Sequence, residues 1–151
     1  MKCNMISAVE TVNEHYRVII EKDFQGIIDK YVPSPDTYVV LEGPRLTTRG
    51  FDKISKGWGD FCMSPIQLLS INWIEGPFSE ETAQMAWVSG IIKLSIQVSD
   101  RVFENIFRAS FVLIGQGSHW KIQHEHVSVV HPDPYGIGDW SKLNTPTSTA
   151  S

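Results

Sequence analysis

From residue 66 to residue 130 the sequence is one strand candidate after another, with only short turns between them. The candidates are rich in β-branched and aromatic residues and cover residues 66–75, 82–98, 102–114 and 118–130. The segments between them contain glycine, proline, serine and aspartate, which are typical of tight turns. Consecutive strands joined by short turns pair as an antiparallel meander. The second half of the chain is therefore expected to form one sheet.

The first part of the sequence has the pattern of helices instead. Apolar residues recur at helical spacing over residues 6–20, and Ser7 with Glu10 forms a capping box that predicts the start of this helix. Asp23 predicts the cap of a second, shorter helix. A third amphipathic helix is predicted over residues 51–61. Three helices thus precede the long strands.

The predicted order is helix, helix, a short strand over residues 37–41, helix and four long strands, which defines an α+β fold. The sheet must bury one face under the helices, and long twisted strands curve around them. We expect a curved, mostly antiparallel sheet wrapped around three N-terminal helices, with a cavity between the two layers. The length of 151 residues suits a single domain, expected over residues 1–140, and the polar residues 141–151 predict a disordered tail.

The last strand carries the most unusual pattern, because His124, His126 and Ser128 occupy alternate positions in an otherwise apolar segment. Side chains of a regular strand alternate between its faces, so these three are predicted to share one face with Trp120. A polar group in an apolar stripe is costly unless it finds a partner. We therefore expect this face to line the cavity, with the two imidazoles as candidate proton carriers. Alternatively, both rings are structural and bond to hydroxyl groups beneath the helices.

The preceding strand adds Arg108 and Ser110 on one face, and hairpin pairing places them beside the histidines. An arginine that faces a cavity can hold a carboxylate or an enolate oxygen. Its alternative role is a salt bridge to Glu125 or another acid. The candidate catalytic residues are His124, His126 and Arg108. The candidate ligand-binding residues are Ser110, Ser128, Trp120 and Trp58.

Four short segments carry a resemblance to a known family. They are Thr48–Ile54, Ala86–Gly90, Arg108–Ser110 and, most specifically, Trp120–Ser128. With these segments the chain resembles a SnoaL-like, ketosteroid-isomerase-like member of the nuclear transport factor 2 superfamily. The resemblance implies a cone-shaped α+β fold and a homodimer through the sheet. It also implies, for the isomerase and polyketide cyclase members, a carboxylate base inside the cone, which matches no definite residue of this sequence.

The strand candidate over residues 82–98 supports a dimer independently. Trp87 and Ile91 lie on one of its faces and Val88 and Ile92 on the other, so both faces are apolar. In a monomer one of these faces would be a large exposed apolar patch. We therefore expect a homodimer through the sheet.

Several partners and cofactors are not expected. The net charge is −4 and no basic cluster is present, so we predict no nucleic-acid partner. No apolar run could span a bilayer and no secretory signal is apparent, so we predict a cytoplasmic protein without a membrane partner. Cys3 and Cys62 lack metal-binding spacing, and the pair His124 and His126 would need a third ligand, so no metal is predicted. No glycine-rich phosphate loop is present, and no other cofactor is predicted.

Together these patterns predict a protein that binds a small hydrophobic or carbonyl-containing ligand. The resemblance implies isomerase-type or cyclase-type general acid–base chemistry on that ligand. The alternative is a non-catalytic ligand-binding or oligomerisation module.

Overall fold

The computed structural model describes residues 6–144; Cys3 and the predicted tail beyond residue 144 lie outside the described residues. The helices and strands follow the predicted order, with one added short strand and a terminal 3₁₀ helix. They are α1 (Ala8–Ile20), α2 (Phe24–Ile28), β1 (Tyr38–Val40), β2 (Thr48–Arg49), α3 (Phe51–Met63), β3 (Ile66–Glu81), β4 (Met85–Val98), β5 (Arg101–Gln116), β6 (His119–Ser128) and η1 (Trp140–Asn144).

The first two helices begin at the predicted caps. The Ser7 hydroxyl accepts a hydrogen bond from the backbone N–H of Glu10 at 3.1 Å, and the Asp23 carboxylate accepts one from Gly26 at 3.1 Å. The third helix begins at Phe51, where the predicted range begins, and residues 48–49 just before it form β2 beside β1. Gly50, with φ of 99°, then turns the chain into α3.

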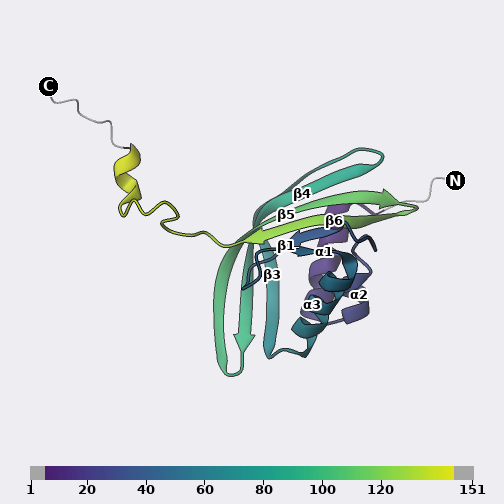
Figure 1. Ribbon diagram of the computed structural model, residues 1–151, viewed down its shortest axis with the longest axis horizontal. Helices are drawn as coiled ribbons and strands as arrows, with labels where there is room; N and C mark the ends of the chain where they lie inside the picture. The colour runs from purple at the N-terminus through teal and green to yellow at the C-terminus, as the bar shows by residue number, and fades with distance from the viewer. Residues whose placement is uncertain (1–5, 145–151) are drawn as a thin grey trace.

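The six strands form one sheet in the order β2-β1-β6-β5-β4-β3. All neighbours are antiparallel except β1 and β6, which are parallel. The sheet curves, and the three helices lie on one side of it (Figure 1). The predicted α+β cone is therefore confirmed. Within residues 6–144 no helix is both long and apolar enough to cross a membrane.

Strand β3 is longer than predicted, because it continues through Gly76 and Pro77 instead of ending there. Its pairing with β4 shifts register on both sides of Glu75, so the strand bends at this point without breaking. Gly90 on β4 makes the bend possible: a Cβ atom at Gly90 would lie 2.3 Å from the carbonyl oxygen of Glu75 and 2.9 Å from the Trp73 ring.

A second irregularity, in β6, decides which side chains face the helices. Ile122 pairs with Leu113, but the next pair joins His124 to Val112, so β6 contains one extra residue. Such a bulge reverses the alternation of faces beyond it. Ile122 and Trp120 are buried before the bulge, and Glu125 and Val127 are buried after it. His124 and His126 consequently lie on the outer face of the sheet, the face turned away from the helices.

The core fills the space between the helices and the inner face of the sheet. On β4 and β5 the inward side chains alternate with outward ones, as a sheet with one covered face requires. The buried side chains include Val12 and Ile19 of α1, Ile27 of α2, and Val88, Phe111 and Leu113 of the sheet. Complete burial of such a side chain contributes about 1.5–3 kcal/mol to the free energy of unfolding, so the packing of the helices on the sheet is the main source of stability.

The chain leaves the sheet after Ser128. Residues 129–144 extend away from the body on the side of the sheet opposite to the helices (Figure 1). Residues 141–144, which fall in the predicted tail, are part of η1.

Candidate functional site

A cavity of about 530 Å³ lies between α3 and the half of the sheet formed by the start of β3, the end of β4 and the start of β5. Its wall is mainly apolar, built by residues that the helical and strand periods turn to the same side. They include Val39, Leu41, Ile54, Trp58, Phe61, Leu68, Leu94, Ile96, Phe103 and Phe107. A cavity of this size can hold a small organic molecule.

Polar and charged residues line the cavity mainly on one side, formed by the loop after β1 and by α3. They are Glu42, Arg45, Thr47, Thr48, Lys53 and Asp60. An apolar wall with a few polar groups is the usual make-up of a small-molecule site, since the apolar part supplies affinity and the polar groups orient the ligand.

Glu42 is the most unusual of these lining residues. It follows the first strand, and its residue surface is exposed at the cavity mouth. The protein atoms around its carboxyl nevertheless remove enough water to raise its pKa from 4.5 to about 7, with a further contribution from the negative charge of Glu125. A carboxyl with a pKa near 7 can both accept and return a proton at neutral pH.

A buried polar cluster lies deeper, where the three helices meet β6. The hydroxyl of Tyr31 donates a hydrogen bond to Glu125 and accepts one from the indole N–H of Trp58 at 3.0 Å. Nε2 of His15 lies 3.3 Å from the Tyr31 hydroxyl and 3.7 Å from the Glu125 carboxylate. His15 is 0% exposed and Glu125 2% exposed. Trp58 lines the cavity as well, so it joins the cluster to the ligand space.

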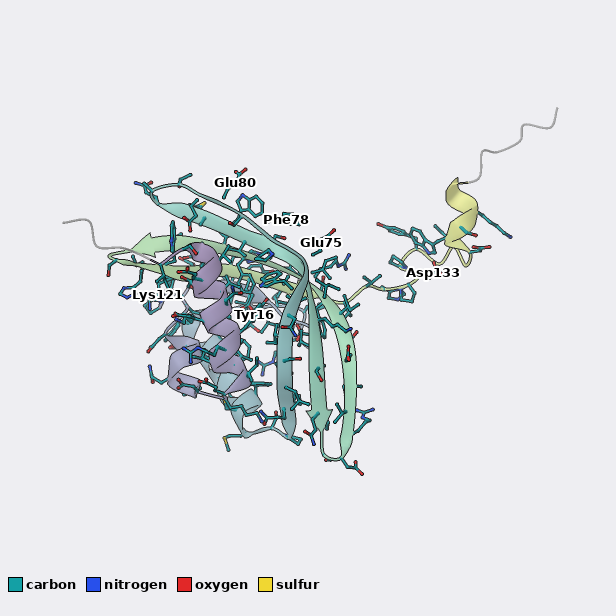
Figure 2. The ribbon with its side chains drawn as sticks, turned by 180° about the vertical axis from the view of Figure 1, so that it is seen from behind. Tyr16, Glu75, Phe78, Glu80, Lys121 and Asp133 are labelled. Atoms are coloured by element: carbon teal, nitrogen blue, oxygen red, sulfur yellow. The ribbon has the colours of Figure 1, made fainter. Side chains whose placement is uncertain are left out.

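The charge of Glu125 shapes the acidity of its neighbours. Burial, followed by the charge of Glu125, raises the pKa of Tyr31 well above its ordinary value, so Tyr31 keeps its proton and remains a donor. Burial and the charges of Glu125 and Glu42 raise the pKa of Tyr16 in the same way. Tyr16 lies between α1 and the sheet (Figure 2).

Two buried polar atoms have no hydrogen-bond partner among residues 6–144: Nδ1 of His15 and the hydroxyl of Tyr16. Burying such an atom without a partner costs about 1–3 kcal/mol. Unpaired atoms of this kind are uncommon in protein cores. Either atom could form a hydrogen bond with a polar group that enters the interior.

The predicted orientation of His124 and His126 is wrong, because the bulge turns them outward. The His124 ring stacks on Tyr38 at 5.5 Å, and its Nδ1 lies 2.8 Å from the Tyr38 carbonyl oxygen. His126 is exposed. Neither residue lines the cavity described above. A catalytic role for either stays a prediction, and the cavity does not support it.

The other predicted site residues divide between the two faces. Arg108, Ser110 and Ser128 lie near the histidines, as expected, but on the outer face. There Arg108 donates to the carbonyl of Val129 at 3.1 Å and Ser110 lies 2.7 Å from the hydroxyl of Ser89. Trp120 faces inward but is packed in the core, away from the cavity wall. Trp58 is the predicted ligand contact that lines the cavity.

The sequence contained a signal for Glu125 and His15, neither of which was predicted as a site residue. The buried apolar residues of β6 are Trp120 and Ile122 and then Val127, and a step of five residues cannot keep one face of a regular strand. That odd step indicates a bulge between 122 and 127 and places Glu125 inside. His15 lies three residues after Val12 and four before Ile19, on the buried face of α1. No comparable local signal marks Glu42, whose pKa depends on distant elements.

Across residues 6–144 no group of three or more histidine, cysteine, aspartate or glutamate side chains is arranged to hold a metal ion.

Comparison with known proteins identifies the family. A model of the SnoaL-like domain matches residues 9–132. A search of curated proteins finds no match. Among solved structures, a ketosteroid isomerase-like protein from Erwinia carotovora atroseptica superimposes with a TM-score of 0.69 at 12% identity, covering 87% of this chain and 100% of that one. A nuclear transport factor 2-like superfamily protein from Salmonella enterica serovar Typhimurium gives 0.70 at 18% identity, covering 86% and 93%.

A third structure, a nuclear transport factor 2-like protein from Cytophaga hutchinsonii, gives a TM-score of 0.63 at 12% identity and covers 81% of this chain and 94% of its own. At these identities the solved structures show the fold alone, whereas the family model spans most of the chain. The chain therefore belongs to the SnoaL-like domain family, and its fold is that of nuclear transport factor 2-like proteins.

Proposed function

We propose that this protein binds a small, largely apolar carbonyl compound in its cavity and that Glu42 moves a proton on that ligand. The observation that carries the proposal is a carboxyl group with a pKa of about 7 at the mouth of a mainly apolar cavity of about 530 Å³. A base works best when its pKa lies near the working pH, and an apolar wall holds the carbon skeleton.

The proposed step is proton abstraction next to the carbonyl group. The Glu42 carboxylate takes the proton, the C–H bond breaks, an O–H bond forms on Glu42, and the electron pair moves onto the carbonyl oxygen as an enolate. Lys53 and Arg45, the cations of the cavity lining, are suited to stabilise this negative oxygen. Return of the proton from Glu42 to another carbon would complete an isomerisation.

The buried cluster supports this chemistry indirectly. Glu125 lies behind Trp58, and its charge helps to keep the pKa of Glu42 high. The hydrogen bonds from Trp58 to Tyr31 and from Tyr31 to Glu125 fix the Trp58 side chain in the cavity wall. The cluster thus positions a wall residue and tunes the base.

Ligand binding is tested with prodan, a fluorescent naphthyl ethyl ketone whose emission shifts in apolar surroundings. We expect prodan to bind the wild-type protein and Leu68→Trp to weaken binding more than tenfold, because the added ring fills the cavity. The neighbouring Leu69 is exposed, so Leu69→Trp is a matched control that should leave binding unchanged. Equal binding by both variants would contradict the cavity as the binding site.

Catalysis is tested with the same ketone by following exchange of its α-hydrogens for deuterium in heavy water. The wild-type protein should accelerate exchange, and the rate should rise as the pH increases through about 7, where Glu42 loses its proton. Glu42→Gln should keep prodan binding and lower the exchange rate at least about 100-fold, the usual effect of losing a general base. Binding without any exchange would instead favour the alternative, a non-catalytic ligand-binding module.

We also propose a homodimer through the outer face of the sheet. On this face the apolar residues Met85, Trp87 and Ile106 are 41–54% exposed. Apolar residues gathered on one sheet face are typical of an interface. Packing about a two-fold axis would bury this face in both copies. A cytoplasmic location stays a prediction from the sequence.

A further inference from the structure

The segment Val129–Asn144, here called the C-terminal arm, leaves the body of its own chain. At its start the arm is tied to the sheet by the hydrogen bond that Arg108 donates to the carbonyl of Val129. Beyond that point the arm projects from the side of the sheet opposite to the helices (Figure 1). Asp133, in the middle of the arm, lies far from Tyr16 at the junction of α1 and the sheet (Figure 2).

The arm nevertheless has a defined local structure, centred on Asp133. The carboxylate of Asp133 accepts hydrogen bonds from the backbone N–H of Ile137 at 2.8 Å, from that of Gly138 at 2.9 Å and from the Trp140 indole at 2.9 Å. These bonds also lower the pKa of Asp133. Gly136 and Gly138 have φ values of 66° and 89°, which favour glycine, so the sequence is suited to this turn.

The turn presents apolar side chains to the outside. Tyr135 is 81% exposed and packs beside Trp140, with their ring centroids 5.9 Å apart. Val130 is 64% exposed, and Ile137 is exposed as well. A preordered segment with exposed apolar side chains is suited to binding, because little conformational entropy remains to be lost when it docks.

The direction of the arm makes a second copy of this chain the candidate partner. The arm projects on the outer side of the sheet (Figure 1), and Met85, Trp87 and Ile106 of the outer face are exposed. The arm and this face belong to the same chain, but the arm points away from its own sheet. In a two-fold dimer each arm would lie against the other copy, so both pairs of apolar surfaces would be covered at the same time.

We propose that the C-terminal arm docks on the outer sheet face of a second copy of this chain and clamps the dimer. This inference rests on the proposed dimer but adds a separate element to it. The arm supplies the Tyr135, Ile137 and Trp140 side chains, and Asp133 holds them in the docking shape. Each substitution in the arm affects two contacts, one for each copy, so the dissociation constant of the dimer responds strongly to it.

The test is sedimentation equilibrium of the full chain over a range of concentrations. Wild type should dimerise, and the double variant Tyr135→Ala/Ile137→Ala should weaken the dimer at least about tenfold. Asp133→Ala should weaken it similarly, because the turn loses three hydrogen bonds. Met63→Ala is the control, since Met63 is 89% exposed at the end of α3, outside both the arm and the sheet, and should leave the dimer unchanged.

A second variant separates the arm from the sheet. Trp87→Ala should also weaken the dimer, because Trp87 lies on the receiving face. If Trp87→Ala weakens the dimer while the arm variants do not, the sheet dimer stands and the role of the arm is refuted. A wild-type chain that stays monomeric at every concentration would refute both the sheet dimer and the docking of the arm. The proposal for the cavity and Glu42 does not depend on this result.

Discussion

At the scale of single residues, the hydroxyl of Tyr31 connects the helices to the sheet through hydrogen bonds. It bonds Glu125 of β6 and Trp58 of α3 and lies 3.3 Å from His15 of α1. A buried carboxylate is tolerated only when it is hydrogen-bonded, so the stability of Glu125 inside the cone depends on this neighbour.

Replacing Tyr31 with phenylalanine should therefore destabilise the protein by about 3 kcal/mol, because the Glu125 carboxylate and the Trp58 N–H both lose their partner. Urea denaturation at neutral pH measures the change. Tyr38→Phe, on the outer face, should change the free energy of unfolding by less than about 0.5 kcal/mol. Equal effects of the two substitutions would show that the buried cluster contributes little.

At the scale of elements, the fold is shaped by the places where strands depart from regular pairing. The bend of β3 opposite Gly90 and the bulge in β6 both change which side chains meet the helices. Such irregularities concentrate curvature in long strands, which is how one sheet can surround a cavity.

Gly90→Ala tests the β3 bend. The new methyl group would meet the carbonyl oxygen of Glu75 at 2.3 Å, so we expect a loss of about 2 kcal/mol in the free energy of unfolding. Gly59→Ala is the matched control: it lies inside α3, where the added Cβ has an ordinary 3.6 Å contact with Phe24. It should stabilise the protein by about 0.5–1 kcal/mol, since alanine favours a helix more than glycine does. Thermal and urea unfolding report both changes.

At the scale of the whole molecule, stability should depend on pH through Glu42. Its pKa rises from 4.5 to about 7 on folding, so the folded state binds the proton more tightly than the unfolded state. The resulting stabilisation is complete below pH 4.5 and is lost as the pH rises through about 7. Wild type should therefore lose stability relative to Glu42→Gln between about pH 5 and pH 8, measured by urea denaturation at each pH. If the difference in free energy of unfolding between wild type and Glu42→Gln does not change with pH, the Glu42 carboxyl is solvent-exposed.

Much of the fold follows from local sequence patterns. The caps at Ser7 and Asp23, the amphipathic pattern of the helices and the alternation along β4 and β5 are short-range features that act before any tertiary contact forms. They are sufficient to predict an antiparallel sheet covered by three helices, and Trp58 on the apolar side of α3.

The candidate site depended on contacts between distant elements. The even spacing of His124 and His126 predicted their inward orientation. One extra residue in β6 turns them outward and places Glu125 inside instead, because a shift of one residue reverses side-chain orientation in a strand. The acidity of Glu42 likewise results from the protein atoms and the charge of Glu125 that folding brings around it. The sequence alone determined the elements and their order. Only the tertiary structure decided which face each polar group occupies and how strongly it holds its proton.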